Sequence, residues 1–391
     1  MRRLRPLLFW THLMAGLLSG VVVLIMSVTG VLLTYQKQMT LWADLRGVQA
    51  GPPTPGATRL SADSLLRLVA SRESKTPTTV VWRQGAAMPV EVQFGRAGRQ
   101  YLNAYTGTVV GTGSASMRKL FSVATDWHRW LATSDESRKT GRLVTGWSNL
   151  AFLVLVLTGI VLWWPRVVKW SALRQVLWFR RGLSPKARDF NWHNVIGIWS
   201  AIPLAIIVAS AAVISFPWAS DLVYRAVGDT PPARAPEGAP VGGAAAGRPA
   251  LGTEGGAVVP LVGDVAALAT ERMPDWRTVS LAWPKNAEAP LVYTLDRGMG
   301  GEPHKRATLT VSRTGEPAKW QPFSSQSEGR RARSIMRFAH TGEVLGFWGQ
   351  TLAGLVSLGA AVLVYTGLYL SLRRFLAWRR RANTVPAATT A

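Results

Sequence analysis

The chain has 391 residues, with 45 Lys and Arg against 21 Asp and Glu, and it contains no cysteine. The lack of cysteine excludes disulfides, thiolate-bound zinc, iron–sulfur clusters and covalent haem attachment through a Cys-x-x-Cys-His motif. A net charge of +24 suits a nucleic-acid-binding protein only when the basic residues form a patch on a folded domain. They are not arranged in that way here, so no nucleic-acid partner is predicted.

Four apolar runs are each long enough to predict a membrane-spanning helix. They cover residues 7–35, 147–164, 195–218 and 344–372. Tryptophans lie at or near their ends, as is typical of membrane–water interfaces. The first run is too long for the apolar core of a signal peptide and no small-residue cleavage site follows it, so it predicts a retained helix.

The polar segments between the runs predict the orientation. Residues 1–9, 165–192 and 371–391 carry 15 of the 45 Lys and Arg but only one acidic residue, Asp189. Because short basic segments stay on the cytoplasmic side, both termini are predicted to be cytoplasmic. Residues 36–146 and 219–343 then lie on the opposite side, which is the periplasm if the membrane is a bacterial inner membrane.

The two external segments repeat one order of elements. The first predicts a helix at 61–70 with Ser61 as its N-cap, strands at 79–83, 90–94 and 99–103, and a turn at 105–107. The second predicts a helix at 262–269, strands at 278–283, 290–296 and 307–312, and a turn at 313–315. The Gly/Ala/Pro-rich residues 229–260 predict a flexible linker. The chain is therefore interpreted as an internal duplication.

Four of the five histidines occupy repeated positions. His12 and His193 lie at the cytoplasmic ends of the first and third runs, whereas His128 and His340 precede the second and fourth runs on the external side. Two histidines on each side, from different helices, are what two bis-imidazole haems require. Metal binding without porphyrin and a proton relay are the alternatives. His304 falls outside the repeat and is interpreted as a solvated loop residue.

Small and basic residues accompany these histidines. Gly16 and Gly20 follow His12 at four and eight residues, and Gly197 and Ala201 follow His193 in the same way, which leaves room for a macrocycle on one helical face. Arg129 and Arg337 lie beside His128 and His340 and are candidates to bind haem propionates. A Thr-Gly pair recurs at 29–30, 158–159 and 366–367. No residue is assigned as catalytic.

The length of the first helix poses a question about electron transfer. Residues 12–35 span roughly 35 Å at the helical rise. The outer histidines must therefore dip into the membrane, or an aromatic residue such as Trp199 must relay electrons.

These motifs resemble the PepSY-associated transmembrane helix family of bacterial inner-membrane proteins. The resemblance is carried by Trp10-Thr11-His12 with Gly16, Trp127-His128-Arg129, residues 158–164, Asn191-Trp192-His193 with Gly197, and Ala339-His340-Thr341-Gly342. It implies an iron-regulated membrane protein with PepSY-like external domains. Some members of the family act as ferric-siderophore reductases that carry haem b.

The combined prediction is an α-helical membrane protein with four transmembrane helices (an internal duplication) and two small α+β PepSY-like external domains. The four transmembrane helices are predicted at 1–35, 147–165, 193–218 and 344–372. The external domains are predicted at 36–117 and 261–325, with the external connection at 219–260. The histidine segments cover 118–146 and 326–343, and the basic cytoplasmic segments cover 166–192 and 373–391.

The expected function is that of a di-haem b reductase in the bacterial inner membrane. It would pass electrons from a quinol or a partner protein to a periplasmic ferric siderophore and release Fe(II). The alternative is a PepSY-type binding or regulatory module without redox activity, serving a protease or siderophore transport.

Overall fold

The computed structural model describes residues 4–73, 75–165, 168–233, 265–284, 286, 289–312 and 317–383. Its chain divides into two compact units. The first comprises Met1–Gln36, Lys119–Val223 and Met336–Ala391, and the second comprises Lys37–Arg118 and Tyr224–Ile335. Most of the predicted linker (234–260), the start of the helix predicted at 262–269 and the turn predicted at 313–315 lie outside the described residues.

The first unit contains the four predicted spans. They are the helices α1 (Leu4–Leu33), α5 (Ser137–Trp163), α7 (Pro185–Ser215) and α11 (Gly346–Asn383). Each contains an apolar window long enough to cross a membrane, so the chain is a multi-pass membrane protein. Helices α5, α7 and α11 extend beyond the predicted runs, because polar residues continue the helical hydrogen bonding where a span leaves the hydrocarbon.

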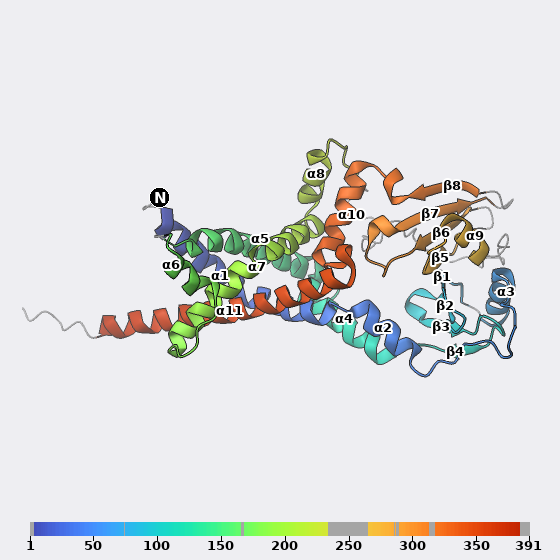
Figure 1. Cartoon of the computed structure of the whole chain (residues 1–391), viewed down its shortest axis with the longest axis horizontal. Helices are drawn as coiled ribbons and strands as arrows, with labels where there is room; N and C mark the ends of the chain where they lie inside the picture. The colour runs from blue at the N-terminus through green and yellow to red at the C-terminus, as the bar shows by residue number, and fades with distance from the viewer. Residues whose placement is uncertain are drawn as a thin grey trace, which may run out of the picture. The chain divides into compact units, whose positions relative to one another are not determined.

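The four spans form a bundle in which α1 and α7 lie on a diagonal. Helix α1 packs against α5 and α11, and α7 packs against the same two helices (Figure 1). The bundle core is aliphatic apart from one phenylalanine: Val23, Phe152, Val156, Leu204, Val208, Val356, Ala360 and Val364. Large apolar side chains such as Leu18, Ile202 and Leu355 remain exposed on the outside. These side chains face lipid in a bilayer.

Shorter helices flank the spans. Helix α4 (Ala115–Trp130) leads into α5, and α10 (Glu328–His340) leads into α11. The loop between α5 and α7 contains α6 (Trp170–Leu177), α2 (Gln36–Leu45) follows α1, and α8 (Pro217–Ala226) follows α7. The two histidine segments are therefore helical and end directly before the turns into the second and fourth spans.

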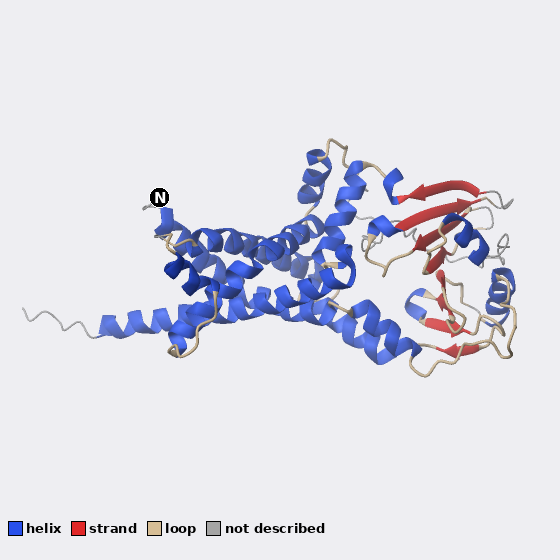
Figure 2. Cartoon of the chain, viewed as in Figure 1, coloured by secondary structure: helices blue, strands red, loops and turns tan. Residues whose placement is uncertain are grey.

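The second unit is built on an antiparallel sheet (Figure 2). Its strands are β1 (Thr79–Arg83), β2 (Val90–Gln93), β3 (Arg99–Leu102), β4 (Val109–Gly111), β5 (Thr278–Ala282), β6 (Leu291–Asp296), β7 (Arg306–Val311) and β8 (Pro317–Pro322). Helices α3 (Ala62–Arg72) and α9 (Val265–Arg272) precede the two sets of strands. Six strands agree with the predicted ones, and Ser61 caps α3 as predicted, by accepting a hydrogen bond from the Ser64 amide.

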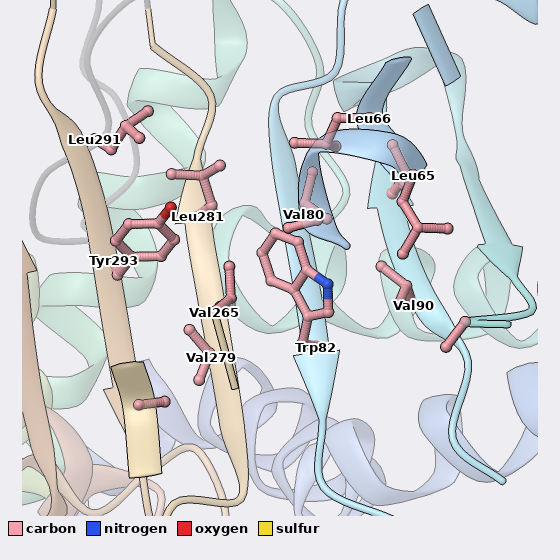
Figure 3. Close-up of a cluster of buried hydrophobic side chains, with 14 of the residues drawn as sticks. Leu65, Leu66, Val80, Trp82, Val90, Val265, Val279, Leu281, Leu291 and Tyr293 are labelled. Carbon is pink, nitrogen blue, oxygen red and sulfur yellow. The ribbon is translucent and has the colours of Figure 1, made fainter. Parts of the chain in front are cut away.

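The two external modules share one sheet instead of forming two separate ones. The strand order is β4-β3-β2-β1-β5-β6-β7-β8, so the equivalent strands β1 and β5 pair in antiparallel register at the centre. Buried partners such as Val80 and Leu281 meet across this pair, and Trp82 meets Val279 (Figure 3). Pairing β1 with β5 removes the exposed strand edge that each module would otherwise present to water.

Asp44 at the end of α2 is a buried charge that joins three segments of the external unit. It is 3% exposed and accepts hydrogen bonds from the Tyr101 hydroxyl (2.7 Å), the Ser114 amide (2.7 Å) and Arg118 (2.5 Å). Burial raises the pKa of Asp44, but the bonds from Ser114, Tyr101 and Arg118 outweigh burial and hold that pKa below its usual value.

Replacing Asp44 by Asn should destabilise the external unit by roughly 2–3 kcal/mol, because Arg118 loses its buried counter-charge. Since the folded pKa of Asp44 is depressed, its stabilisation is complete at neutral pH and is lost as the pH falls through the folded pKa. The unfolding midpoint of the wild type should therefore fall more than that of Asp44→Asn on acidification. Glu271→Gln, at an exposed and long ion pair with Arg272, is the control and should leave stability unchanged. Equal losses in both variants would contradict this.

Candidate functional site

The structure brings the four repeated histidines together as two pairs. His12 on α1 and His193 on α7 have ring centres 6.5 Å apart. His128 on α4 and His340 on α10 have ring centres 6.2 Å apart. Each pair therefore combines one histidine from each half of the duplicated chain. The first pair is called the inner pair and the second the outer pair.

Three of the histidines are anchored by threonines of the recurring Thr-Gly pairs. The Nδ1 atom of His12 lies 2.9 Å from the hydroxyl of Thr158 on α5, and that of His193 lies 2.9 Å from the hydroxyl of Thr366 on α11. The Nδ1 atom of His128 lies 3.0 Å from the hydroxyl of Thr29 on α1. The sequence repeat thus marks the helix turns that hold the imidazoles.

The threonine hydrogen bonds determine which ring nitrogen carries the proton. The hydroxyls of Thr158, Thr366 and Thr29 donate to carbonyls of their own helices, at Val154 (2.6 Å), Val362 (2.8 Å) and Ile25 (2.6 Å). Each threonine oxygen is therefore an acceptor toward the imidazole, so that Nδ1 is the protonated donor. Nε2 then keeps its lone pair and is the nitrogen available to bind a metal.

His340 has a different anchor. Its Nδ1 donates to the backbone carbonyl of Ile207 at 3.0 Å. Ser210 stands 17 residues after His193, just as Thr29 stands 17 residues after His12, so it occupies the threonine position of the second half. The Ser210 hydroxyl instead donates to the same Ile207 carbonyl at 2.8 Å. One carbonyl therefore serves both residues.

The glycine of each Thr-Gly pair lies under an imidazole edge. A Cβ atom added at Gly159, Gly30 or Gly367 would meet Cε1 of His12, His128 or His193 at 3.5, 3.5 and 3.4 Å. An alanine just fits at these distances, and a larger side chain would displace the ring. The glycines predicted to make room for a macrocycle face leucines: Gly16 faces Leu155, Gly20 faces Leu368 and Gly197 faces Leu363.

The outer histidines dip toward the inner pair. Thr29 and Met26, which face His128, are 17 and 14 residues from His12 along α1. The two pairs are thus separated by about 21–26 Å along the helix instead of 35 Å. Trp199, the other predicted relay, lies outside the bundle core: its indole is 63% exposed and donates to the Leu177 carbonyl of α6.

Arginines cluster beside the outer pair. The guanidiniums of Arg129 and Arg138 lie over the Trp130 ring at 4.6 and 4.4 Å from its centre. Partial burial, followed by the charges of Arg142, Arg337 and Arg138, lowers the pKa of Arg129. The predicted propionate partners Arg129 and Arg337 are thus part of one positively charged group.

The turns beside this cluster are tightly built. In the α4–α5 turn, Leu131 and Ala132 adopt left-handed backbone conformations, with φ of 52° and 55°. A Cβ atom at Gly141 would collide with the Trp130 carbonyl, so only glycine allows α5 to approach that turn. This close approach fixes the end of α4, which carries His128 and Arg129.

The donor set suits an iron porphyrin. Two imidazoles on opposite sides of one metal, each with a bond of about 2 Å, have ring centres about 6 Å apart. Both pairs match this spacing. Among the described residues, no group of three or more His, Asp or Glu side chains could hold a metal ion. Each pair would supply two imidazole ligands to an iron whose other ligands come from a porphyrin. His304 is exposed and belongs to neither pair.

The comparison with protein families identifies the family of the chain. The model of the PepSY-associated TM region matches residues 9–374. The chain belongs to this family. The match includes all four spans, both histidine pairs and the whole external sheet. No curated protein matches the sequence.

The pairing can be tested in the natural cysteine-free background of the chain. The double variant His12→Cys/His193→Cys should react with a short bifunctional thiol reagent to give an intramolecular cross-link, because the two side chains face each other across the bundle. His128→Cys/His340→Cys should do the same. The mixed control His12→Cys/His128→Cys should not, since His128 on α4 lies beside Thr29, which is 17 residues along α1 from His12. Cross-linking only of the mixed pair, read on a protease-digested sample by mass spectrometry, would overturn the pairing.

Proposed function

We propose that this chain binds two haem b groups, one on each histidine pair, and carries electrons across the membrane to an external ferric chelate. The observation that supports it most is the presence of two imidazole pairs with ring centres 6.5 and 6.2 Å apart, in which the Nδ1 atoms are engaged by hydrogen bonds. A single such pair could be a packing feature. Two pairs, duplicated and at opposite ends of one bundle, favour a cofactor at each end.

The residues have separable roles in this proposal. His12 and His193 would be the axial ligands at the inner end, and His128 and His340 those at the outer end. The threonine hydroxyls keep Nδ1 protonated and fix the ring planes. Arg129 and Arg337 would bind propionates at the outer end. Gly16, Gly20 and Gly197 would adjoin the inner macrocycle. When bound, haem supplies reversible one-electron chemistry between Fe(III) and Fe(II).

The direction of transfer follows from the proposed topology. In this topology the basic termini and the 165–192 loop are cytoplasmic, so the inner pair would lie on the cytoplasmic side and the outer pair and the sheet on the periplasmic side of a bacterial inner membrane. The electron donor would be a membrane quinol or a partner protein. The acceptor would be a ferric siderophore, in which one electron converts Fe(III) to the more weakly bound Fe(II), so that iron is released.

Haem stoichiometry tests this proposal directly. The purified protein should show a Soret band that shifts on dithionite reduction and about two haems per chain in the pyridine haemochrome assay. Because the chain has no cysteine, this haem should be extracted completely by acidified butanone. His12→Ala should retain one haem, held at the outer pair, and His340→Ala should retain one haem, held at the inner pair.

His304→Ala is the matched control and should retain both haems. Colourless protein from cells supplied with ample haem would refute the redox function and favour the non-redox PepSY module. If the reduced, haem-loaded protein is not reoxidised by a ferric siderophore, the haem sites stand and the assigned acceptor is wrong.

A further inference from the structure

The hydrogen-bond acceptors around the two histidine pairs are unequal. Both inner histidines donate to a threonine oxygen, and the backbone of Leu155 or Leu363 lies nearby. At the outer pair, His128 has the equivalent arrangement with Thr29 and Met26. His340 has only the Ile207 carbonyl, which it shares with Ser210. The outer pair is therefore one threonine acceptor short.

The positive charges around the pairs are unequal as well. Arg129 adjoins His128 in the sequence, and Arg337 lies one turn from His340 on α10. On the inner side, no described arginine adjoins a paired histidine in the sequence, although Arg374 lies over the rings of Phe9 and Trp10, three and two residues before His12. Arg188 lies five residues before His193 and is paired with Asp189 at 2.9 Å. Arg5 lies seven residues before His12, and Arg373 lies seven residues after Thr366, which is about 10 Å along a helix.

We propose that these two differences place the outer haem at a higher reduction potential than the inner haem, so that the chain itself drives electrons outward. The inference rests on the proposed haem sites and deepens them. A stronger acceptor at Nδ1 makes the imidazole more basic and stabilises Fe(III), which lowers the potential. A nearby positive charge favours the less positive Fe(II) form and raises it. Both effects act in the same direction here.

Ser210 is the residue responsible for the missing acceptor at His340. In the first half, the hydroxyl at the equivalent position bonds to its own helix through the carbonyl four residues back, which leaves the oxygen facing His128. In the second half, the Ser210 hydroxyl donates to the Ile207 carbonyl, three residues back, and so competes with His340 for that acceptor. Ser210 is completely buried, so no solvent replaces the missing acceptor. We regard it as a positioning residue that tunes His340.

An optical redox titration of the purified full-length protein tests the proposal without any activity assay. The wild type should titrate in two separated one-electron steps. Thr158→Val, which removes an inner acceptor without changing side-chain volume, should raise the lower step and leave the upper step unchanged. Thr29→Val should raise the upper step alone. Each shift should correspond to a change of up to about tenfold in the ratio of oxidised to reduced haem at a fixed ambient potential, the value of one hydrogen bond.

Ser210→Thr should lower the upper step and bring the two steps together, because it restores the missing acceptor. The matched control is Ser200→Thr, the same change at another buried serine of α7 that bonds within its own helix, ten residues away. It should leave the upper step unchanged. Coincident steps in the wild type, or Thr29→Val moving the lower step, would overturn the inference while the haem sites stand. Colourless protein would instead refute the proposed function.

Discussion

The hydrogen bond at Nδ1 of each paired histidine is the constraint on which the site depends. A neutral imidazole placed in an apolar bundle has one N–H to satisfy, and leaving it unpaired costs about 1–3 kcal/mol. Here a turn of a neighbouring helix accepts it in every case, at Thr158, Thr366, Thr29 and Ile207. Because Nδ1 is committed, Nε2 is left for chemistry. The same bonds fix the register of α4 and α10 against the spans, since a shift of one residue would remove the acceptor.

Internal duplication explains why the hydrogen-bond anchor of a histidine and its paired histidine come from different halves of the chain. Each histidine is anchored by its own half of the chain, as His12 is by Thr158 and His193 by Thr366, but its paired ring comes from the other half. The sheet repeats this logic, because β1 of the first half pairs with β5 of the second. Neither half alone would have a complete imidazole pair or a covered strand edge. Two copies of one unit therefore make a site that a single copy cannot.

Periodicity and turn chemistry were sufficient to predict the spans, six strands and the Ser61 cap. The short edge strands β4 and β8 were missed, since three residues after a turn and a strand that begins and ends at proline carry no alternation. The joining of the two modules could not be predicted either, because a buried edge strand has the same pattern whether its neighbour is another strand or a helix. The length of each span was underestimated where polar residues continue a helix.

The histidine sites were predictable only in part. Repeated spacing identified the four histidines and the Thr-Gly pairs, but nothing in the sequence alone joined one set to the other, because Thr158 is 146 residues from His12. Ser210 could have been found by one signal, the shared offset of 17 residues from His12 to Thr29 and from His193 to Ser210. The effect of Ser210 on His340 depends on which backbone carbonyl accepts the hydrogen bond of the serine hydroxyl. That choice is made only in the folded helix.

The apolar interior of the bundle increases the energetic effect of the differences in hydrogen bonding and charge between the two histidine pairs. Between the two pairs the core is aliphatic apart from Phe152, with valines such as Val23, Val156 and Val356 filling the space. Electrostatic effects are screened little in an apolar interior, so one additional acceptor or one nearby guanidinium would alter the energy of an iron bound there, as we propose, far more than it would in water. Ser19 and Ser27 of α1 are also buried, so this helix carries polar side chains among the aliphatic ones. The bundle thus holds two histidine pairs about 21–26 Å apart along α1, and the different acceptors at Ser210 and Thr29 distinguish one end from the other.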